Sequence, residues 1–395
     1  NMNEQMKESE ESILHTYNRF PVVFEKGQGC YLYDSEGKEY LDFAAGIAVN
    51  SLGYHYPGYD EALKDQIDKL MHISNLYYNE PIIEAGAKLV KASKMSKAFF
   101  TNSGTEAIEG ALKAAKKYAY VRDGHADHEI IAMNHSFHGR SIGALSVTGT
   151  AHYREPFEPL MGGVKFADFN NLESVKAQIT DKTCAIITEV VQGEGGIYPA
   201  KKEFLEGLRQ ICDEKDIMLI FDEIQCGMGR TGHYFAWQAY GVQPDIMTSA
   251  KALGCGVPVG AFVLGEKAAK ASLEPGDHGT TYGGNPFVCA AVSKVFDIYE
   301  NDKIIEHVQE MTPYLEQKLD EIVAKHKCAA TRRGMGFMQG IVIQGRPVGE
   351  VVKAALAKGL LVISAGSDVL RIVPPLVITK EHIDKMAAIL DECME

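Results

Sequence analysis

The middle of the chain alternates short apolar runs with segments of helical periodicity. Strands are predicted where the apolar runs fall, at 96–102, 129–133, 184–191, 218–221 and 261–264. Helices are predicted over 105–121, which is rich in Ala and Lys, and over 204–215, where apolar residues recur at helical spacing. Nearly continuous apolar strands that alternate with helices indicate an α/β fold with a mostly parallel sheet covered on both faces.

The two ends of the chain have a different pattern. Residues 29–43 resemble a β-hairpin whose turn is Asp34-Ser-Glu-Gly37. The C-terminal part predicts helices over 286–300, 303–326 and 348–358, a strand over 337–343, and a pair of short strands within 361–373. This mixture is typical of a smaller α+β domain.

Three domains are predicted from these patterns. Residues 1–50 would form an N-terminal segment that packs with the small domain, 51–285 a large domain, and 286–395 the C-terminal small domain. The second boundary falls at Gly283-Gly284-Asn285-Pro286, because this cluster breaks one element and favours the start of a helix.

Composition narrows the class of protein. The 395 residues are 46% hydrophobic and 24% charged, as in a globular protein, and the net charge of -13 argues against binding nucleic acid or anionic membranes. The longest apolar runs have the length of strands rather than membrane spans. Eight scattered cysteines and a polar, acidic N-terminus predict reduced thiols and a cytoplasmic location.

Asn102-Ser103-Gly104-Thr105-Glu106 lies between a predicted strand and a predicted helix. Small residues at the start of a helix let an anion approach the free N–H groups, and the helix dipole favours its charge. The simpler interpretation is a helix cap formed by Ser103 or Thr105. Both interpretations can hold together.

Asp222 and Lys251 each end an apolar stretch. A carboxylate at the end of a parallel strand lies where such sheets bind ligands, so Asp222 either holds a protonated heteroaromatic nitrogen or caps a turn. Burial lowers the pKa of a lysine and makes it a good imine partner. Alone, Lys251 is more simply explained as a snorkelling side chain. Together with Asp222 and the 102–106 loop, the imine interpretation is favoured.

Other polar residues follow the strands. Phe137 could stack on a planar ring or belong to the core. Arg140 and Arg371 have the planar fork that suits a carboxylate, with a surface salt bridge as the alternative. His135 and His138 are three residues apart, but no acidic or cysteine partner is nearby in the sequence, so we expect no metal site.

Gly227-Met-Gly-Arg-Thr-Gly232 matches the dinucleotide pattern G-x-G-x-x-G. The pattern needs a helix directly after it and an acidic residue about twenty positions on. The residues that follow do not resemble a helix start, and Asp245 comes too soon. An NAD-dependent dehydrogenase is therefore the weaker alternative.

The ordered set of motifs resembles the class III aminotransferases, the ω-amino-acid group of fold type I pyridoxal-phosphate enzymes. The resemblance covers nearly the whole chain, from 16–24 through 42–49 to 371–375. Within this class, 17–19, 74–78 and 278–286 are most similar to the acetylornithine aminotransferases. The resemblance implies transfer of the δ-amino group of N2-acetylornithine to 2-oxoglutarate, a step of arginine biosynthesis.

The resemblance also implies roles in holding pyridoxal phosphate. Lys251 would form the imine with the cofactor and then transfer protons. Asp222 would pair with the pyridinium nitrogen, Gln225 would approach the phenolic oxygen, and Phe137 would stack on the ring. The phosphate would be bound by Ser103, Gly104 and Thr105.

Substrate and partner roles follow in the same way. Arg140, with Thr280 nearby, would hold the carboxylate of acetylornithine, and Arg371 would take the α-carboxylate of 2-oxoglutarate. Glu194 would mask Arg371 while the other substrate is bound. Thr281 would reach the phosphate of the neighbouring subunit, which implies a homodimer with shared active sites.

Two residues, Cys255 and Asn79, depart from the family pattern and bear on substrate preference. Ornithine, succinylornithine and 4-aminobutyrate therefore stay open as alternative amino donors. A non-catalytic relative that uses the fold as a binding scaffold is a further alternative. The presence of Lys251, Asp222 and Thr105 together argues against it.

Overall fold

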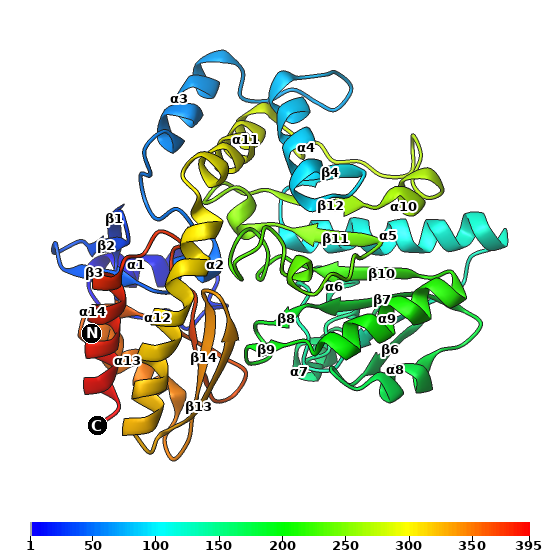
Figure 1. The fold of residues 1–395 in the computed structure, drawn as a ribbon. Coiled ribbons are helices and arrows are strands. Elements are labelled where there is room, and N and C mark those ends of the chain that lie inside the picture. Colours follow the sequence, from blue (N-terminus) through cyan, green and yellow to red (C-terminus); the bar gives the residue numbers. More distant parts are fainter. Residues whose placement is uncertain (1) are drawn as a thin grey trace.

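The computed structural model describes residues 2–395 and is built around a seven-stranded sheet (Figure 1). The strand order is β4-β12-β11-β10-β7-β5-β6. In that order the strands are Lys97–Thr101, Gly260–Leu264, Ile246–Ser249, Met218–Asp222, Thr183–Glu189, Glu129–Met133 and Val164–Ala167. Only β12 runs antiparallel to its neighbours, which confirms a mostly parallel sheet.

Alternate residues of the central strands enter two separate cores. In β10, Met218 and Ile220 pack in the core beneath α5 (Gly104–Asp123), whereas Leu219 and Phe221 pack in the larger core that includes α9 (Lys202–Lys215). Every residue of β7, β10, β11 and β12 is buried. These strands are nearly continuously apolar because helices cover both faces of the sheet, as predicted.

The hairpin near the N-terminus is confirmed, and it joins a strand from the far end of the chain. β1 (Phe24–Gln28), β2 (Tyr31–Asp34) and β3 (Glu39–Asp42) are antiparallel, and β15 (Leu360–Leu361) adds to β3 in parallel. A second antiparallel sheet has the order β13-β14-β17-β16. Its strands are Ala329–Met335, Met338–Ile343, Val369–Ile372 and Ile363–Ala365.

Of the later helices, α11 (Pro286–Asn301) lies toward the top of Figure 1. α12 (Ile304–Lys325), α13 (Val348–Ala357) and α14 (Lys380–Cys393) accompany the small sheets at the left. α11, α12 and α13 were predicted to within two residues at each end. The division of the chain into domains at residues 50 and 285 stays a prediction.

The remaining elements are shorter or peripheral. The helices are α1 (Glu4–Ser12), α2 (Ala45–Ala48), α3 (Tyr59–Lys69), α4 (Glu80–Ser93), α6 (Ile142–Ser146), α7 (Ala151–Arg154), α8 (Leu172–Gln178) and α10 (Glu266–Lys270). The 3-10 turns are Glu155–Phe157, Ala236–Ala239 and Lys251–Leu253, and β8 (Val191–Gln192) pairs with β9 (Tyr198–Pro199). α2 is a left-handed turn, because φ is positive at each of its four residues.

One strand prediction was wrong in its extent. The apolar run 184–191 is not a single strand, because β7 ends at Glu189 and β8 begins at Val191 in another sheet. Val190 and Val191 are nevertheless buried in the larger core. The apolar pattern therefore continues past the point where the chain leaves the main sheet.

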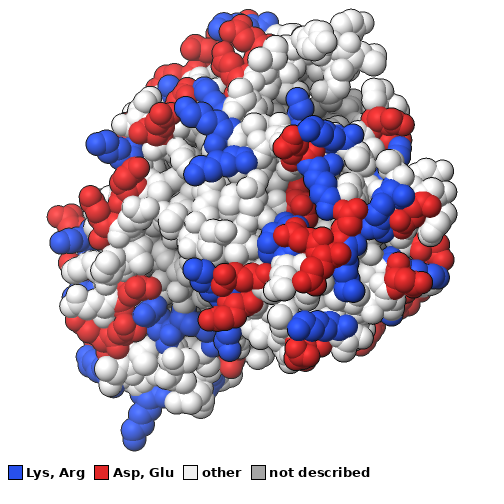
Figure 2. All heavy atoms as spheres, turned by 45° about the vertical axis from the view of Figure 1, so that its right-hand side comes forward, with Lys and Arg blue, Asp and Glu red and all other residues white. Residues whose placement is uncertain are grey.

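The surface agrees with an acidic, globular chain. In Figure 2, lysines and arginines are interspersed with aspartates and glutamates, and a stretch of uncharged surface crosses the middle of this face. Within residues 2–395, no helix combines the length and the apolar character that a bilayer span needs.

Two helix glycines allow a direct test of the α5 packing. A Cβ on Gly110 of α5 would overlap the ring of Phe262, which is buried in β12, whereas a Cβ on Gly86 of α4 would lie 3.9 Å from Phe100 Cε2. We expect Gly110→Ala to lower the free energy of unfolding by about 1–3 kcal/mol, because the rigid ring cannot move aside. Gly86→Ala should raise it by about 0.5–1 kcal/mol through helix propensity alone.

Equilibrium denaturation of both variants measures the difference. Equal stability of the two variants would contradict the close contact between α5 and β12.

Candidate active site

The carboxyl ends of three parallel strands bring polar residues to one edge of the main sheet. Register in the ladder places Asp222 of β10 opposite Glu189 of β7 and opposite Thr248 of β11. Lys251 follows the end of β11 in a 3-10 turn, with a positive φ of 46°. Open parallel sheets bind ligands at this edge.

A cavity of about 560 Å³ opens at this edge. Nine of the residues predicted for the site line it: Ser103, Gly104, Thr105, Phe137, Arg140, Glu194, Asp222, Gln225 and Lys251. Arg371 lies directly behind the wall, hydrogen-bonded to Glu194 and Gln225. Thr280 and Thr281 do not line the cavity in the single chain.

The start of α5 forms the anion-binding end of the cavity. The Oγ of Ser103 accepts a hydrogen bond from Glu106 N at 3.2 Å, which confirms the cap interpretation. The N–H groups of the first turn have no partner within the helix, so those of Gly104 and Thr105 can serve an anion. A Cβ on Gly104 would lie 3.0 Å from Ile224 Cδ1, so a larger residue here would require this side chain to shift.

Asp222 is held by three groups from three segments. Its Oδ2 lies 2.7 Å from His138 Nδ1, and its Oδ1 accepts from Ile224 N at 2.9 Å and from Thr248 Oγ1 at 3.4 Å. The turn-cap interpretation is thus correct for one oxygen. The buried His138 orients the carboxylate through the other, so this histidine supports a carboxylate instead of a metal ion.

Lys251 has the shifted proton affinity that the sequence predicted. Burial, together with the positive charge of Arg371, lowers its pKa to about 8, while Glu194 and Asp222 oppose the shift. A lysine with this pKa is available as a neutral amine near physiological pH.

Glu189 is a buried acid at the end of β7, beside Asp222. Burial raises its pKa well above the ordinary value, and the neighbouring carboxylate of Asp222 raises it further. Its Oε2 has no hydrogen-bond partner among residues 2–395. The wall of the cavity beside Asp222 therefore carries a carboxyl group that favours its neutral form.

The two predicted carboxylate-binding arginines differ in their surroundings. Arg371, almost fully buried, donates from Nη2 to Glu194 Oε1 at 3.0 Å and from Nη1 to Gln225 Oε1 at 3.1 Å. Arg140 is exposed, lies over the rings of Phe137 and Tyr153, and has no carboxylate within 4 Å in the described part of the chain. The site thus contains one masked arginine and one free arginine.

Several sequence features lie outside this cavity. Thr280 Oγ1 accepts from Asn102 Nδ2 at 3.3 Å, and Thr281 is exposed. Cys255 is buried and accepts from Leu52 N at 3.4 Å. The Gly227–Gly232 loop leads into a 3-10 turn rather than an α-helix, so it lacks the setting of a dinucleotide-binding loop.

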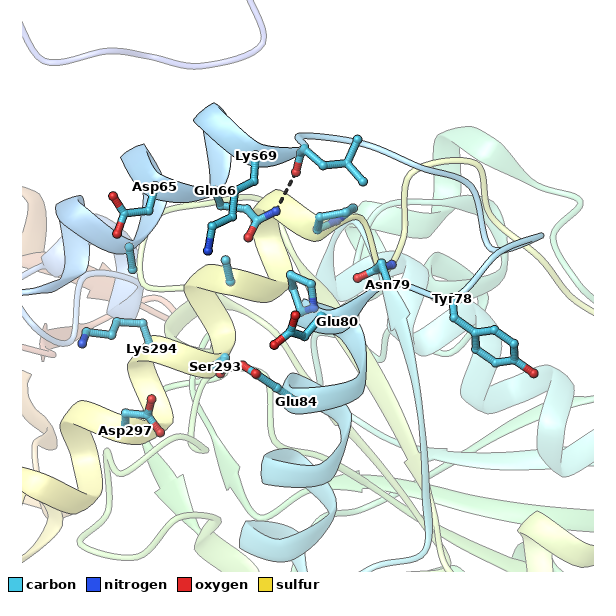
Figure 3. Close-up of a pocket in the computed structure, with 15 residues that line it drawn as sticks. Asp65, Gln66, Lys69, Tyr78, Asn79, Glu80, Glu84, Ser293, Lys294 and Asp297 are labelled. Atoms are coloured by element: carbon cyan, nitrogen blue, oxygen red, sulfur yellow. Dashed lines mark hydrogen bonds between the residues drawn. The ribbon is translucent and has the colours of Figure 1, made fainter.

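A second cavity, of about 460 Å³, lies between α3, α4 and α11 (Figure 3). Asn79 stands at its edge and caps α4, because its Oδ1 accepts from Ile82 N at 2.9 Å. Tyr78 is 94% exposed and points away from this cavity. The departure from the family pattern at Asn79 thus has a local structural explanation.

Comparison with known proteins gives one family. Residues 13–394 match the model for "Aminotransferase class-III". The chain is 47% identical to an acetylornithine aminotransferase of Clostridium acetobutylicum, with 98% of this chain and 100% of the relative covered. It is 48% identical to an acetylornithine aminotransferase of Methanocaldococcus jannaschii over 96% and 95% of the two chains. A succinylornithine transaminase of Yersinia pseudotuberculosis is 44% identical over 95% and 92%.

Solved structures share the whole fold. An ornithine aminotransferase from Toxoplasma gondii superposes with a TM-score of 0.94 at 28% identity, over 98% of this chain and 93% of that one. An N-acetylornithine aminotransferase from Stenotrophomonas maltophilia gives 0.84 at 36% identity, over 95% and 96%. The chain belongs to the class III aminotransferases and is a pyridoxal-phosphate-dependent transaminase of the fold type I architecture.

The residues present fit pyridoxal phosphate. The first turn of α5 suits a phosphate, the anchored Asp222 suits a protonated ring nitrogen, and the desolvated Lys251 suits an aldehyde. The unpartnered Oε2 of Glu189 at the cavity wall is a further sign of a site shaped for a polar ligand.

The pH dependence of the reaction should report the environment of Lys251. Proton transfer by Lys251 requires its neutral amine, and this fraction grows as pH rises through the pKa of about 8. In single turnovers with a 2-oxo acid, we expect the rate constant to rise with a midpoint near pH 8 and to fall about tenfold per pH unit well below it.

Stopped-flow absorbance between pH 6 and 10 measures this profile. A midpoint near the value of an exposed lysine would contradict the desolvated site.

Proposed function

We propose that this transaminase transfers the δ-amino group of N2-acetyl-L-ornithine to 2-oxoglutarate. The products are N-acetylglutamate 5-semialdehyde and L-glutamate, and the reaction is a step of arginine biosynthesis. Acetylornithine aminotransferases at 44–48% identity over nearly the full chain support this choice of donor.

The pair of unequal arginines carries the proposal. An enzyme that transfers an amino group from N2-acetylornithine to 2-oxoglutarate must accept a monocarboxylate donor and a dicarboxylate acceptor at one site. The free Arg140 suits the single carboxylate of acetylornithine, and the masked Arg371 avoids a lone buried charge while that donor is bound. When 2-oxoglutarate enters, its α-carboxylate replaces Glu194 on Arg371.

The remaining roles concern the cofactor. When bound, pyridoxal phosphate supplies the carbon that carries the amino group between substrates and a ring that accepts electron density. Lys251 binds its aldehyde, Asp222 holds the ring nitrogen, Phe137 stacks on the ring, and Gln225 approaches the phenolic oxygen. The phosphate is bound by Ser103, Gly104 and Thr105.

Lys251 also moves the proton. Its neutral Nζ takes a proton from the δ-carbon of the donor, and burial together with Arg371 enlarges the neutral fraction by lowering the pKa to about 8. Arg140 fixes the distant carboxylate and so places the δ-carbon of the donor within reach of Lys251. His138 keeps Asp222 aligned through the 2.7 Å contact with its Oδ2.

We propose that the chain acts as a homodimer with shared sites. Leu76, Tyr77 and Tyr78 are 86%, 65% and 94% exposed, and Tyr282, beside Thr281, is also exposed. Large apolar side chains in such a cluster favour burial against a partner. Thr281 would then reach the phosphate of the partner's site, with Thr280 near the substrate.

The eight cysteines, all with free thiols, suit a cytoplasmic enzyme.

Single-turnover spectra with different amines test the choice of donor. N-acetylornithine, ornithine, N-succinylornithine and 4-aminobutyrate are mixed in turn with the holoenzyme. We expect N-acetylornithine to react with a kcat/KM at least about tenfold above ornithine and 4-aminobutyrate, because a free α-amine competes for the site and the shorter acid does not reach Arg140. A faster reaction with ornithine would overturn the choice of donor, and a faster reaction with N-succinylornithine would favour that alternative.

The Glu194–Arg371 pair gives a second test. Glu194→Ala leaves Arg371 without its mask, so the half-reaction with glutamate should gain over that with acetylornithine by about tenfold, equivalent to about 1.4 kcal/mol. Glu316→Ala serves as a control, since Glu316 pairs with Arg332 away from the cavity. An unchanged ratio in Glu194→Ala would show that the pair does not select substrates.

A further inference from the structure

Arg230 is a buried arginine that the reaction described above does not use. It lies in the Gly227–Gly232 loop, is 1% exposed, and heads the largest fully buried side chains of the chain. Its Nη1 donates to Phe337 O at 2.9 Å and to Pro374 O at 2.8 Å. Among residues 2–395, its Nε and Nη2 have no acceptor, and no carboxylate lies within 4 Å of it.

A buried guanidinium without a counter-ion is costly. Burial lowers the pKa of Arg230 to about 10, so the group stays charged at neutral pH. The ionisable neighbours are Tyr299 and Cys255, and burial raises the pKa of each, so neither is an anion at that pH. An apolar side chain would fill this space at lower cost, so the retained charge needs a reason.

The two carbonyls that Arg230 binds mark one end of the strand pair that carries Arg371. Phe337 directly precedes β14, Pro374 follows β17 by two residues, and Gly340 of β14 pairs with Arg371 of β17. Phe337 N donates back to Arg230 O at 2.7 Å. The loop therefore joins the end of this ladder through three hydrogen bonds.

The other end of this segment contacts the side chain of Arg371. Gln225, five residues before Arg230, accepts from Arg371 Nη1. Residues 225–230 thus hold the guanidinium of Arg371 and the end of its strand at once. A shift of the β14–β17 pair relative to the main sheet would move Arg371 away from the cavity.

We propose that Arg230 is a positioning residue that fixes the Arg371 clamp through the end of its strand pair. This inference rests on the proposed role of Arg371 as the carboxylate clamp. It does not depend on which ω-amine is the donor.

Two variants separate position from charge. Arg230→Lys keeps the positive charge but lacks the fork that bridges two carbonyls, and Arg230→Met loses both. Arg346→Met is the matched control, since Arg346 also donates to a backbone carbonyl, that of Cys393, and does not line the cavity.

Binding of glutarate, an unreactive dicarboxylate, to each holoenzyme is measured by calorimetry beside the KM values for 2-oxoglutarate and the amino donor. We expect both Arg230 variants to weaken glutarate binding and raise the KM for 2-oxoglutarate about tenfold, with the KM of the donor changed less than about twofold.

Normal glutarate binding in Arg230→Lys would overturn the positioning role. A uniform loss in which kcat and both KM values change together, accompanied by a lower unfolding temperature, would also overturn it in favour of a purely structural residue. If Arg230→Met does not fold, Arg230→Gln replaces it, and normal glutarate binding in this variant would likewise overturn the positioning role. Failure of the proposed function would instead appear in the unsubstituted enzyme, as absence of glutarate binding or of reaction with N-acetylornithine.

Discussion

The active site depends on the register of three parallel strands. Asp222 stands opposite Glu189 and Thr248 because β10 pairs with β7 and β11 in that alignment, and Lys251 follows directly from β11. A slip of one residue would turn Asp222 to the other face of the sheet. The fully buried apolar residues of these strands prevent such a slip, since each must enter one of two cores. The packing that fixes the register of the sheet therefore also fixes the position of the site residues.

The charged side chains of the site differ in whether a partner of opposite charge lies beside them. Arg371 is paired with Glu194, Arg140 is exposed and free, and Arg230 is buried without a carboxylate. Asp222 is hydrogen-bonded to His138, while burial and the charge of Asp222 favour the neutral form of Glu189. Burial and the charge of Arg371 lower the pKa of Lys251, whereas Glu194 and Asp222 oppose this shift.

Local patterns in the sequence were sufficient to predict most helices and strands, and to identify the polar residues at their ends. The strands of the main sheet that are buried on both faces have continuous apolar runs, and the helix cap at Ser103 and the strand end at Asp222 could be recognised from neighbours in the chain. Two edge strands, β6 and β13, were missed. β6 has only four residues, three of them half-buried, and β13 contains Thr331, Arg332 and Arg333. Neither strand gives the apolar signal that burial on two faces produces.

Contacts between distant segments could not be predicted in the same way. His138 and Asp222 are 84 positions apart, and Arg230 meets carbonyls more than 100 positions further on. No periodicity encodes such pairs, because they depend on how loops from different strands meet. For this reason His138 was considered only as a metal ligand, and the loop that contains Arg230 only as a dinucleotide motif.

The central claim is that Lys251 is the residue that binds pyridoxal phosphate covalently. Reduction of the holoenzyme with borohydride, followed by proteolysis and mass spectrometry, tests it most directly. The account predicts one phosphopyridoxyl group per chain, located on Lys251. A modified lysine elsewhere, or no modification in enzyme that contains the cofactor, would contradict the assignment of the site.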